Sequence, residues 1–452
     1  MSLKILLTNN TLAGRAGTEL YVRDVAVELL KRGHTPVAFS TLLGAVAEEL
    51  RAATVPVVEH LDSLATPPDL IHGHHHLETM TALLHFPGVP AIYFCHGWLP
   101  WEELPPKFPR IVRYVAVDET CRDRLVHEHA IPEDRVRLIL NFVDLKRFKP
   151  RGRLPEKPTR ALVFSNNATE NTNLPPVRQA CMAANVELDV TGRGVENPTE
   201  RPEDVLPNYD LVFAKGRAAL EALSVGAAVV LFDAAGVGPM VTTANMRTLR
   251  PLNFGIRTLQ NPLDPDALIQ QIARYNASDA TQVSSWVRQN VGMDSAVDRL
   301  LEVYRDVLEE YQQCARSNAA AELRAASDYL RHWIPNLTLQ HQARARHEAL
   351  RIAYERIRAE CQSRHGATLR QESEYLREQC RNQQEECDTL KCQLDALRRD
   401  YHNVETERDS LRSELDRVYG SLTLRLRNRL IALPGVGPLL RSCVKFVVGR
   451  VS

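Results

Sequence analysis

Short apolar runs alternate with amphipathic stretches through the first two thirds of the chain, and this rhythm constrains the fold more than any other feature. Before Lys149 the apolar runs include KILLTN, TPVAFS, AIYFCHG and VRLILN. Apolar runs of this length between helical patterns predict a parallel sheet wrapped by helices. One such helix is expected from Thr18 to Arg32, with Gly33 at its C-terminal stop.

A second alternating series follows a linker. The segment KPRGRLPEKPTR, between Phe148 and Arg160, is dense in proline and arginine, which is typical of a hinge between domains. After it, ALVFSNN, VELDVTG, YDLVFAKG and AVVLFDA are predicted strands. We therefore predict an α/β chain with two Rossmann-like domains, residues 1–150 and 151–312. Ligands are expected in the cleft at the carboxyl ends of their strands.

Beyond an amphipathic helix expected at 295–311, the composition turns to Arg, Glu, Gln and Ala. We assign residues 313–420 to a helical region. Apolar residues at 4-3 spacing from Leu376 to Val418, broken at Gln383 and Arg408, predict a coiled coil and a homodimer formed through it. A single solvated helix is the alternative.

The last segment, residues 421–452, is a basic amphipathic tail, and no acidic residue follows Asp416. Two interpretations stay open. The tail either makes a peripheral contact with an anionic membrane, or packs on its own protein or a partner.

Composition limits the setting and the partners. The 56 basic and 56 acidic residues cancel, so no nucleic-acid partner is expected. The nine cysteines lack CxxC spacing, which favours a reduced compartment. The N-terminus does not follow a signal-peptide pattern, and no apolar run is long enough to span a membrane. We expect a cytoplasmic protein, with the inner face of the cytoplasmic membrane as the place the tail would reach.

The stretch from 211 to 238, LVFAKGRAALEALSVGAAVVLFDAAGVG, carries the most chemical information. A carboxylate in the first helical turns can accept hydrogen bonds from a ribose diol, while basic groups and free amides at the helix start can hold a diphosphate. Lys215, Arg217 and Glu221 have this arrangement. Arg217 and Glu221, four residues apart, can equally form a surface ion pair of small energetic worth.

Three segments resemble landmark regions of glycosyltransferase family four, a retaining family with the GT-B fold. They are GTEL…ELLKRGH, VAVDETCRDRLVHEHAIPEDRVRLILNFVDLKRFKP and LEALSVGAAVVLFDAAGVG, within roughly residues 3–310. The resemblance implies transfer from a nucleoside-diphosphate sugar with no cofactor and no metal. It also implies that Asn141 and Asp144, in NFVDLKRFKP, are domain-junction residues.

The same resemblance implies roles for individual residues. Gly14 and Gly17 would let backbone amides approach the diphosphate or the acceptor, although glycines there could simply permit a turn. His96 would contact the transferred sugar or the acceptor as a catalytic-site residue, with a structural histidine as the alternative. Glu221 matches the second carboxylate of the family's Glu-(seven residues)-Glu motif, which implies binding of the nucleotide ribose.

Two departures from the family pattern affect the donor site. Phe213 stands eight positions before Glu221, where the family has a glutamate, and SNNATENTN after the hinge lacks the usual Arg and Lys. We expect Lys215, Arg217 and Arg193 to replace the missing charge, because a diphosphate buried without cations is costly. Weak donor binding is the alternative.

The histidines of HGHHH, residues 72–76, suit a metal ion chemically, but successive residues of a strand point to opposite faces. We expect His74 or His76 to line the cleft instead. The sequence as a whole predicts a glycosyltransferase that acts on a glycan or lipid-linked glycan acceptor in cell-surface polysaccharide assembly. The alternative is a non-catalytic GT-B scaffold that organises a glycan-assembly complex through its coiled coil.

Overall fold

The computed structural model describes residues 2–313 and 318–363 together with 375, 376, 378, 379 and 381. One compact unit ends at Ile334, and a second begins at Pro335. The predicted coiled-coil spacing lies outside the described residues except at Leu376, and the predicted tail 421–452 lies entirely outside them. No described helix is long and apolar enough to cross a membrane.

The first domain is a seven-stranded parallel sheet in the order β3-β2-β1-β4-β5-β6-β7. Its strands are β1 (Lys4–Thr8), β2 (Thr35–Phe39), β3 (Val57–Val58), β4 (Leu70–His74), β5 (Ala91–Cys95), β6 (Ile111–Ala116) and β7 (Val136–Leu138). The intervening helices are α1 (Gly17–Lys31), α2 (Ala45–Ala52), α3 (His76–His85) and α4 (Glu119–Asp123). The expected helix at 18–32 is thus confirmed as α1, and Gly33 after it has a left-handed φ of 81°.

The second domain has a five-stranded sheet in the order β12-β11-β10-β8-β9, parallel except for β12. Its strands are β8 (Arg160–Phe164), β9 (Glu187–Thr191), β10 (Leu211–Ala214), β11 (Ala228–Asp233) and β12 (Gly236–Met240). The helices are α5 (Leu174–Ala183), α6 (Pro202–Val205), α7 (Gly216–Val225), α8 (Met246–Leu249), α9 (Pro265–Ile272) and α10 (Ala277–Asn290). The predicted α/β class with parallel sheets is confirmed.

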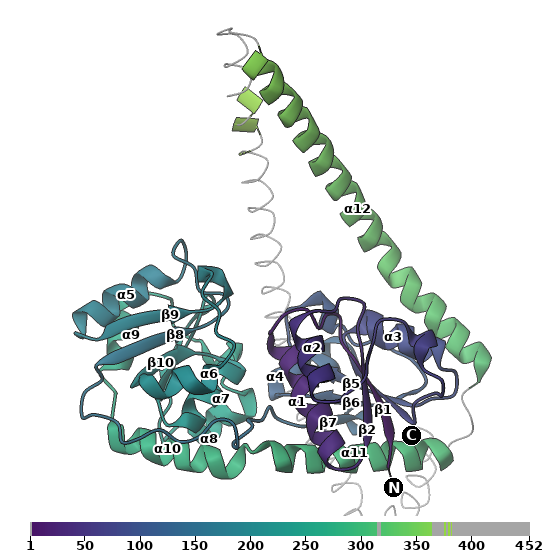
Figure 1. Ribbon diagram of the computed structural model, residues 1–452, viewed down its shortest axis with the longest axis horizontal. Coiled ribbons are helices and arrows are strands. Elements are labelled where there is room, and N and C mark those ends of the chain that lie inside the picture. The colour runs from purple at the N-terminus through teal and green to yellow at the C-terminus, as the bar shows by residue number, and fades with distance from the viewer. Residues whose placement is uncertain (1, 314–317, 364–374, 377, 380, 382–452) are drawn as a thin grey trace, which may run out of the picture. The chain divides into compact units, whose positions relative to one another are not determined.

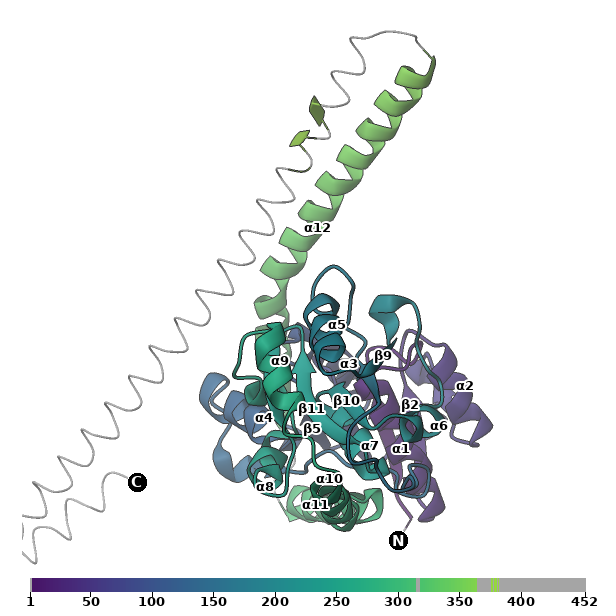
Figure 2. The same ribbon diagram turned by 90° about the vertical axis from the view of Figure 1, so that its left-hand side faces the viewer.

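Side chains of β10 alternate between two apolar clusters, as the period of a strand requires. Leu211 and Phe213 join the cluster with α5 and α9, whereas Val212 and Ala214 join the cluster with α7 and α10. The sheet therefore lies between two helical layers (Figures 1 and 2). This packing fixes the position of the turn that follows β10 and of the start of α7.

Helix α11 (Met293–Gln313) follows the second domain in sequence but packs against the first (Figure 1). Val297, Leu300, Tyr304 and Val307 are buried in the core of the first sheet. The chain passes from the first domain to the second near Val143 and returns near Met293. Backbone hydrogen bonds from Val143 to Val291 and from Met293 to Val143 join these two connecting segments. The sequence assigns residues 293–312 to the second domain, whereas their apolar face completes the first.

Helix α12 (Ala319–Ser363) begins against the first domain. The guanidinium of Arg110, which is 1% exposed, donates to the carbonyls of Leu83, Phe86 and Val89 and pairs with Glu322 of α12. The carbonyls of Leu83 and Phe86 lie at the C-terminal end of α3, where helical acceptors have no partner within the helix, and that of Val89 lies in the loop before β5. Arg110 thus satisfies α3 and anchors α12 at once.

We expect Arg110→Met to lower the free energy of unfolding by about 3 kcal/mol, because three buried carbonyls each lose a charged donor and Glu322 loses the guanidinium of Arg110. Urea unfolding followed by circular dichroism measures the loss. Arg331→Met is the matched control, since the Arg331 side chain is 83% exposed. A loss at position 110 no larger than in the control would contradict the assigned anchoring role.

Candidate functional site

The carboxyl ends of both sheets supply a buried ionic cluster that joins the two domains. Arg217, in the first turn of α7, donates through Nη2 to Oδ2 of Asp24 on α1 and through Nε to Oε1 of Glu221 at 2.9 Å. Arg23 donates to the other oxygen of Asp24 at 2.6 and 2.9 Å. The side chains of Arg217, Asp24 and Glu221 are only 14%, 6% and 5% exposed. We call Asp24, Arg217 and Glu221 the interdomain triad.

Asp24 and Arg217 are charged despite their burial. Burial on its own raises the pKa of Asp24, but the guanidiniums of Arg217, Arg23 and Arg147 bring that pKa below its ordinary value. For Arg217, burial lowers the pKa and the two carboxylates more than compensate, so it stays charged. The charges therefore hold each other in place at the domain boundary.

Glu221 forms the ion pair with Arg217 that the spacing allowed, but the pair is not on the surface. One carboxylate oxygen of Glu221, Oε1, is used by Arg217. The second oxygen, Oε2, has no hydrogen bond within the part of the chain that the structure describes, and it is not among the enclosed unpartnered atoms. A ribose hydroxyl can therefore donate to Oε2 while Arg217 keeps Oε1.

Lys215 is the residue that precedes α7, and no side chain caps this helix. Its ammonium pairs with Asp233 at the end of β11. The other oxygen of Asp233, Oδ1, is buried without a partner. Much of the positive charge that we expected Lys215 and Arg217 to offer a diphosphate is thus already balanced by carboxylates.

Arg193 and Gly14 come together across the domain boundary. A Cβ atom at position 14 would lie 3.1 Å from Cζ of Arg193 and closer still to its Nη2, so the guanidinium lies over the glycine backbone. The backbone amide of Arg193 donates to Oδ1 of Asn166, in the loop after β8. The loop after β8 lacks basic residues, but through Asn166 it positions Arg193 in the loop after β9.

The structure favours close approach over turn geometry as the reason for Gly14. Neither Gly14 nor Gly17 has a positive φ, so neither requires glycine for its backbone conformation. Space around Gly17, the first residue of α1, is open. A bulkier residue is accommodated at 17, whereas one at 14 displaces Arg193.

His96 follows β5 and lies next to the triad. Its Nε2 is 2.7 Å from Nδ1 of His74, and its ring packs edge-on against Tyr21 of α1 with centroids 4.7 Å apart. Burial, together with the charge of Arg217 among other groups, lowers the pKa of His96 well below its usual range. His96 is therefore a neutral imidazole at the edge where the two domains meet.

The other histidines of residues 72–76 are structural in their contacts. His72 bonds the hydroxyl of Tyr304 on α11, and His76 stacks on Trp333 of α12 with centroids 4.2 Å apart. His75 accepts the amide of Asn10 and lies 3.6 Å from Glu103. Burial lowers the pKa of His75 to about 4 and raises that of Glu103 to about 8, so near neutral pH both groups are uncharged.

His74 and His76 are both buried, at 0% and 1% exposure, so, contrary to our expectation, neither lines an open cleft: His74 lies behind His96, and His76 lies within an aromatic cluster. Among the described residues, no group of three or more His, Cys, Asp or Glu side chains is arranged to hold a metal ion.

Phe213 is a core residue of β10. It is fully buried and packs edge-on against Phe232, with centroids 6.1 Å apart. A carboxylate at this position would be buried among the apolar side chains beneath α5 and α9. On this backbone, position 213 is therefore not the place of a lost ligand.

The two implied junction residues lie in the connection between the domains. The carbonyl of Asn141 accepts from Arg250 at 2.5 Å. The Asp144 side chain accepts the amides of Lys146 and Arg147, which closes the turn before the linker. Within the described part of the chain, neither residue forms a hydrogen bond or ion pair with the triad.

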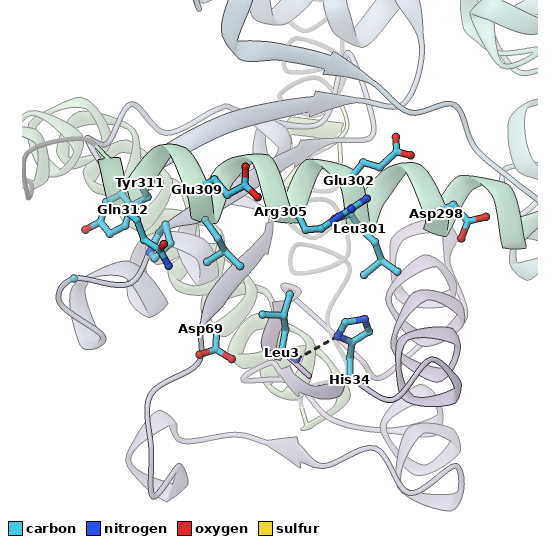
Figure 3. A pocket seen from close by; sticks show the side chains of 13 residues that line it. Leu3, His34, Asp69, Asp298, Leu301, Glu302, Arg305, Glu309, Tyr311 and Gln312 are labelled. Carbon is cyan, nitrogen blue, oxygen red and sulfur yellow. Dashed lines mark hydrogen bonds between the residues drawn. The ribbon is translucent and has the colours of Figure 1, made fainter. Parts of the chain in front are cut away.

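A cavity of about 770 Å³ lies away from this site, at the opposite edge of the first sheet beneath α11 (Figure 3). Leu3 and Asp69 border it just before β1 and β4, and Leu301, Arg305 and Leu308 face it from α11. None of the predicted site residues lines it. The cavity therefore does not coincide with the predicted site.

Sequence reasoning missed Asp24, Tyr21 and Asn166. A signal for Asp24 existed, since it lies three residues after the buried Tyr21 on the inward stripe of α1. A charged residue on that stripe requires a partner when buried. Nothing local predicts that this partner is Arg217, because the contact crosses 193 residues of chain.

Comparisons with known proteins agree with this architecture. Residues 15–147 match the family model described as Glycosyltransferase Family 4. A glycosyltransferase from Rickettsia africae has a similar fold, with a TM-score of 0.52 and 14% identity over 68% of this chain and 99% of that chain. HepE from Anabaena, solved with UDP and glucose, has a TM-score of 0.50 and 14% identity over 67% and 99%. No curated protein matches the sequence. The likeness confirms the predicted GT-B fold.

Asp24→Asn should lower the free energy of unfolding by about 3 kcal/mol, because Arg217 and Arg23 would stay buried without their shared countercharge. Chemical denaturation at neutral pH measures the change. Asp62→Asn is the control, since the Asp62 side chain is 93% exposed, and its effect should stay within about 0.5 kcal/mol. Equal effects of the two substitutions would contradict the claim that the interdomain triad stabilises the folded chain.

Stability should fall as the pH drops from 6.5 toward 4. Burial lowers the pKa of His72 to about 3 and that of His75 to about 4, so the folded chain keeps these rings neutral while the unfolded chain takes up protons. Each such histidine adds a slope that approaches ~1.4 kcal/mol per pH unit. Urea unfolding at pH 7, 6 and 5 follows this loss.

His75→Asn isolates one histidine, because asparagine tolerates the positive φ of 61° at this position and does not titrate. The variant should lose about one histidine's share of the slope, while Glu103, whose raised pKa acts in the opposite direction, is common to both proteins. His127→Asn, at a side chain 66% exposed, is the control. An unchanged slope in His75→Asn would show that folding does not lower the pKa of His75.

Proposed function

We propose that this chain is a glycosyltransferase that moves a sugar from a nucleoside-diphosphate sugar to a glycan or lipid-linked glycan in cell-surface polysaccharide assembly, with retention at the anomeric carbon. The observation that carries the proposal is that residues following strands of both sheets meet across the domain boundary: Arg217, which holds Glu221, pairs with Asp24, and Arg193 lies over Gly14. The Glycosyltransferase Family 4 match over residues 15–147 supports the sugar-transfer chemistry.

In this proposal each side chain contacts a different part of the donor. Oε2 of Glu221 accepts a ribose hydroxyl, because Oε1 is already held by Arg217. Arg193, above the backbone of Gly14, binds the diphosphate, with Lys215 and the start of α7 as further donors. Gly17 exposes backbone at the start of α1, and His96 contacts the transferred sugar.

The reaction breaks the bond between the anomeric carbon and the diphosphate oxygen and forms one from that carbon to an acceptor hydroxyl oxygen. The hydroxyl proton leaves with the nucleoside diphosphate. Cationic side chains would stabilise the charge that develops on the leaving group, so we propose that no metal or other cofactor is needed. Approach of the two domains would exclude water and limit hydrolysis of the donor.

The C-terminal segments bear on the oligomeric state and the cellular location of the enzyme. We propose a cytoplasmic homodimer joined through the segment with 4-3 spacing after Leu376, with the basic tail in peripheral contact with the inner face of the membrane. HepE from Anabaena was solved in complex with UDP and glucose, which makes UDP-sugars the first donors to test.

A second candidate function, a non-catalytic GT-B scaffold, is favoured by one observation. Arg217 and Lys215 are ion-paired with Asp24 and Asp233, so two of the three expected cations are neutralised within the protein. A scaffold would keep these pairs intact, whereas donor binding must add to them or open them.

Isothermal titration of the full chain with UDP-, GDP- and ADP-sugars tests the proposal. We expect one of these nucleotides to bind, and Glu221→Gln to weaken it about tenfold, because a ribose hydroxyl loses a charged acceptor worth ~1.4 kcal/mol. Glu48→Gln, at a side chain 69% exposed, should leave the affinity unchanged.

Two results would count against it. Absence of binding by every nucleotide sugar in the millimolar range would favour the scaffold. Binding that is equally tight in Glu221→Gln would remove the ribose role from Glu221 but keep the transferase reading.

A further inference from the structure

His74 and His96 form a pair of imidazoles that shares one hydrogen bond. Nδ1 of His74 and Nε2 of His96 are 2.7 Å apart, so one proton must lie between them. Burial keeps both rings neutral at neutral pH, and each ring therefore carries one proton. The pair holds two protons, one shared and one on an outer nitrogen.

The surroundings of the two outer nitrogens differ. Nε2 of His74 is enclosed and has no hydrogen-bond partner. His96 is half-buried, and its Nδ1 is not among the enclosed unpartnered atoms. An enclosed N–H group without an acceptor is rarer in proteins than an enclosed acceptor without a donor. The outer proton therefore belongs on Nδ1 of His96, which places the shared proton on Nδ1 of His74.

The ring of His74 is fixed in place by its neighbours. It stacks on His72 with centroids 4.5 Å apart, and Phe94 and Tyr21 lie at 5.2 and 5.5 Å. His72 is itself held by the hydroxyl of Tyr304 at 2.5 Å. Helix α11 thus supports a stack of rings that ends at His96, beside the domain boundary.

We infer that His74 is a positioning residue, which donates from Nδ1 to Nε2 of His96 and so fixes His96 as the tautomer that presents an Nδ1–H donor to a sugar oxygen of the donor substrate. The identity of the acceptor oxygen rests on the proposed function, whereas the tautomer does not. His96 would then act as a hydrogen-bond donor and not as a base, because its remaining nitrogen is occupied by His74.

The tautomer is measured directly by two-bond ¹⁵N–¹H correlation spectra of the full chain labelled at histidine, with the signals of His96 identified by their loss in His96→Asn. We expect Nδ1 of His96 to carry the proton in the unsubstituted protein. His74→Phe keeps an aromatic ring in the stack but removes the donor, and it should release Nε2 of His96 for protonation. His74→Asn retains an amide donor close to the place of Nδ1 and should restore the original tautomer.

Binding provides the second readout. In His74→Phe we expect the affinity for UDP-glucose to fall about tenfold, the worth of roughly one hydrogen bond, while the affinity for UDP alone is unchanged. His74→Asn should recover most of the loss, and His127→Phe, at an exposed position, should resemble the unsubstituted protein. A general loss of packing would weaken both ligands and would not be rescued by asparagine.

A proton on Nε2 of His96 in the unsubstituted protein, or the same tautomer in His74→Phe, would overturn the inference. If neither UDP nor UDP-glucose binds the unsubstituted chain, UDP-glucose is excluded as the donor of the proposed function, and the spectra still decide whether His74 sets the tautomer.

Discussion

The contact between Arg217 and Asp24 is the interaction on which the arrangement of the candidate site depends. It joins α7 of the second domain to α1 of the first, and both side chains are buried. Removing either partner would leave the remaining buried charges of the cluster unbalanced, which is more costly than losing a surface ion pair. The contact also sets Glu221, since the same guanidinium holds one of its carboxylate oxygens.

This constraint explains how two separate sheets present one set of side chains. Parallel strands place the residues that follow them at a single edge, and α11 returns to the first core so that the chain crosses between the domains twice. The buried stack from Tyr304 through His72 and His74 to His96 connects that returning helix to the same edge. Support for His96 thus comes from α11, far from it in sequence.

Periodicity was sufficient to predict the two α/β domains and α1 with its stop at Gly33, because these depend on local spacing and backbone conformation. Periodicity could not predict the ion-pair partners of Lys215 and Arg217, because only the fold brings Asp233 and Asp24 next to them. Phe213 shows the converse. A motif comparison treats the position as a missing ligand, but the alternation of β10 turns its side chain into the core.

A crystal structure of the full chain with UDP tests the central claim, that a nucleotide sugar binds at the domain boundary, most directly. We expect the ribose hydroxyls to bind Oε2 of Glu221 and the diphosphate to lie against Arg193, above the backbone of Gly14. Nucleotide bound elsewhere, for example in the cavity beneath α11, with Glu221 and Arg193 untouched, would contradict it.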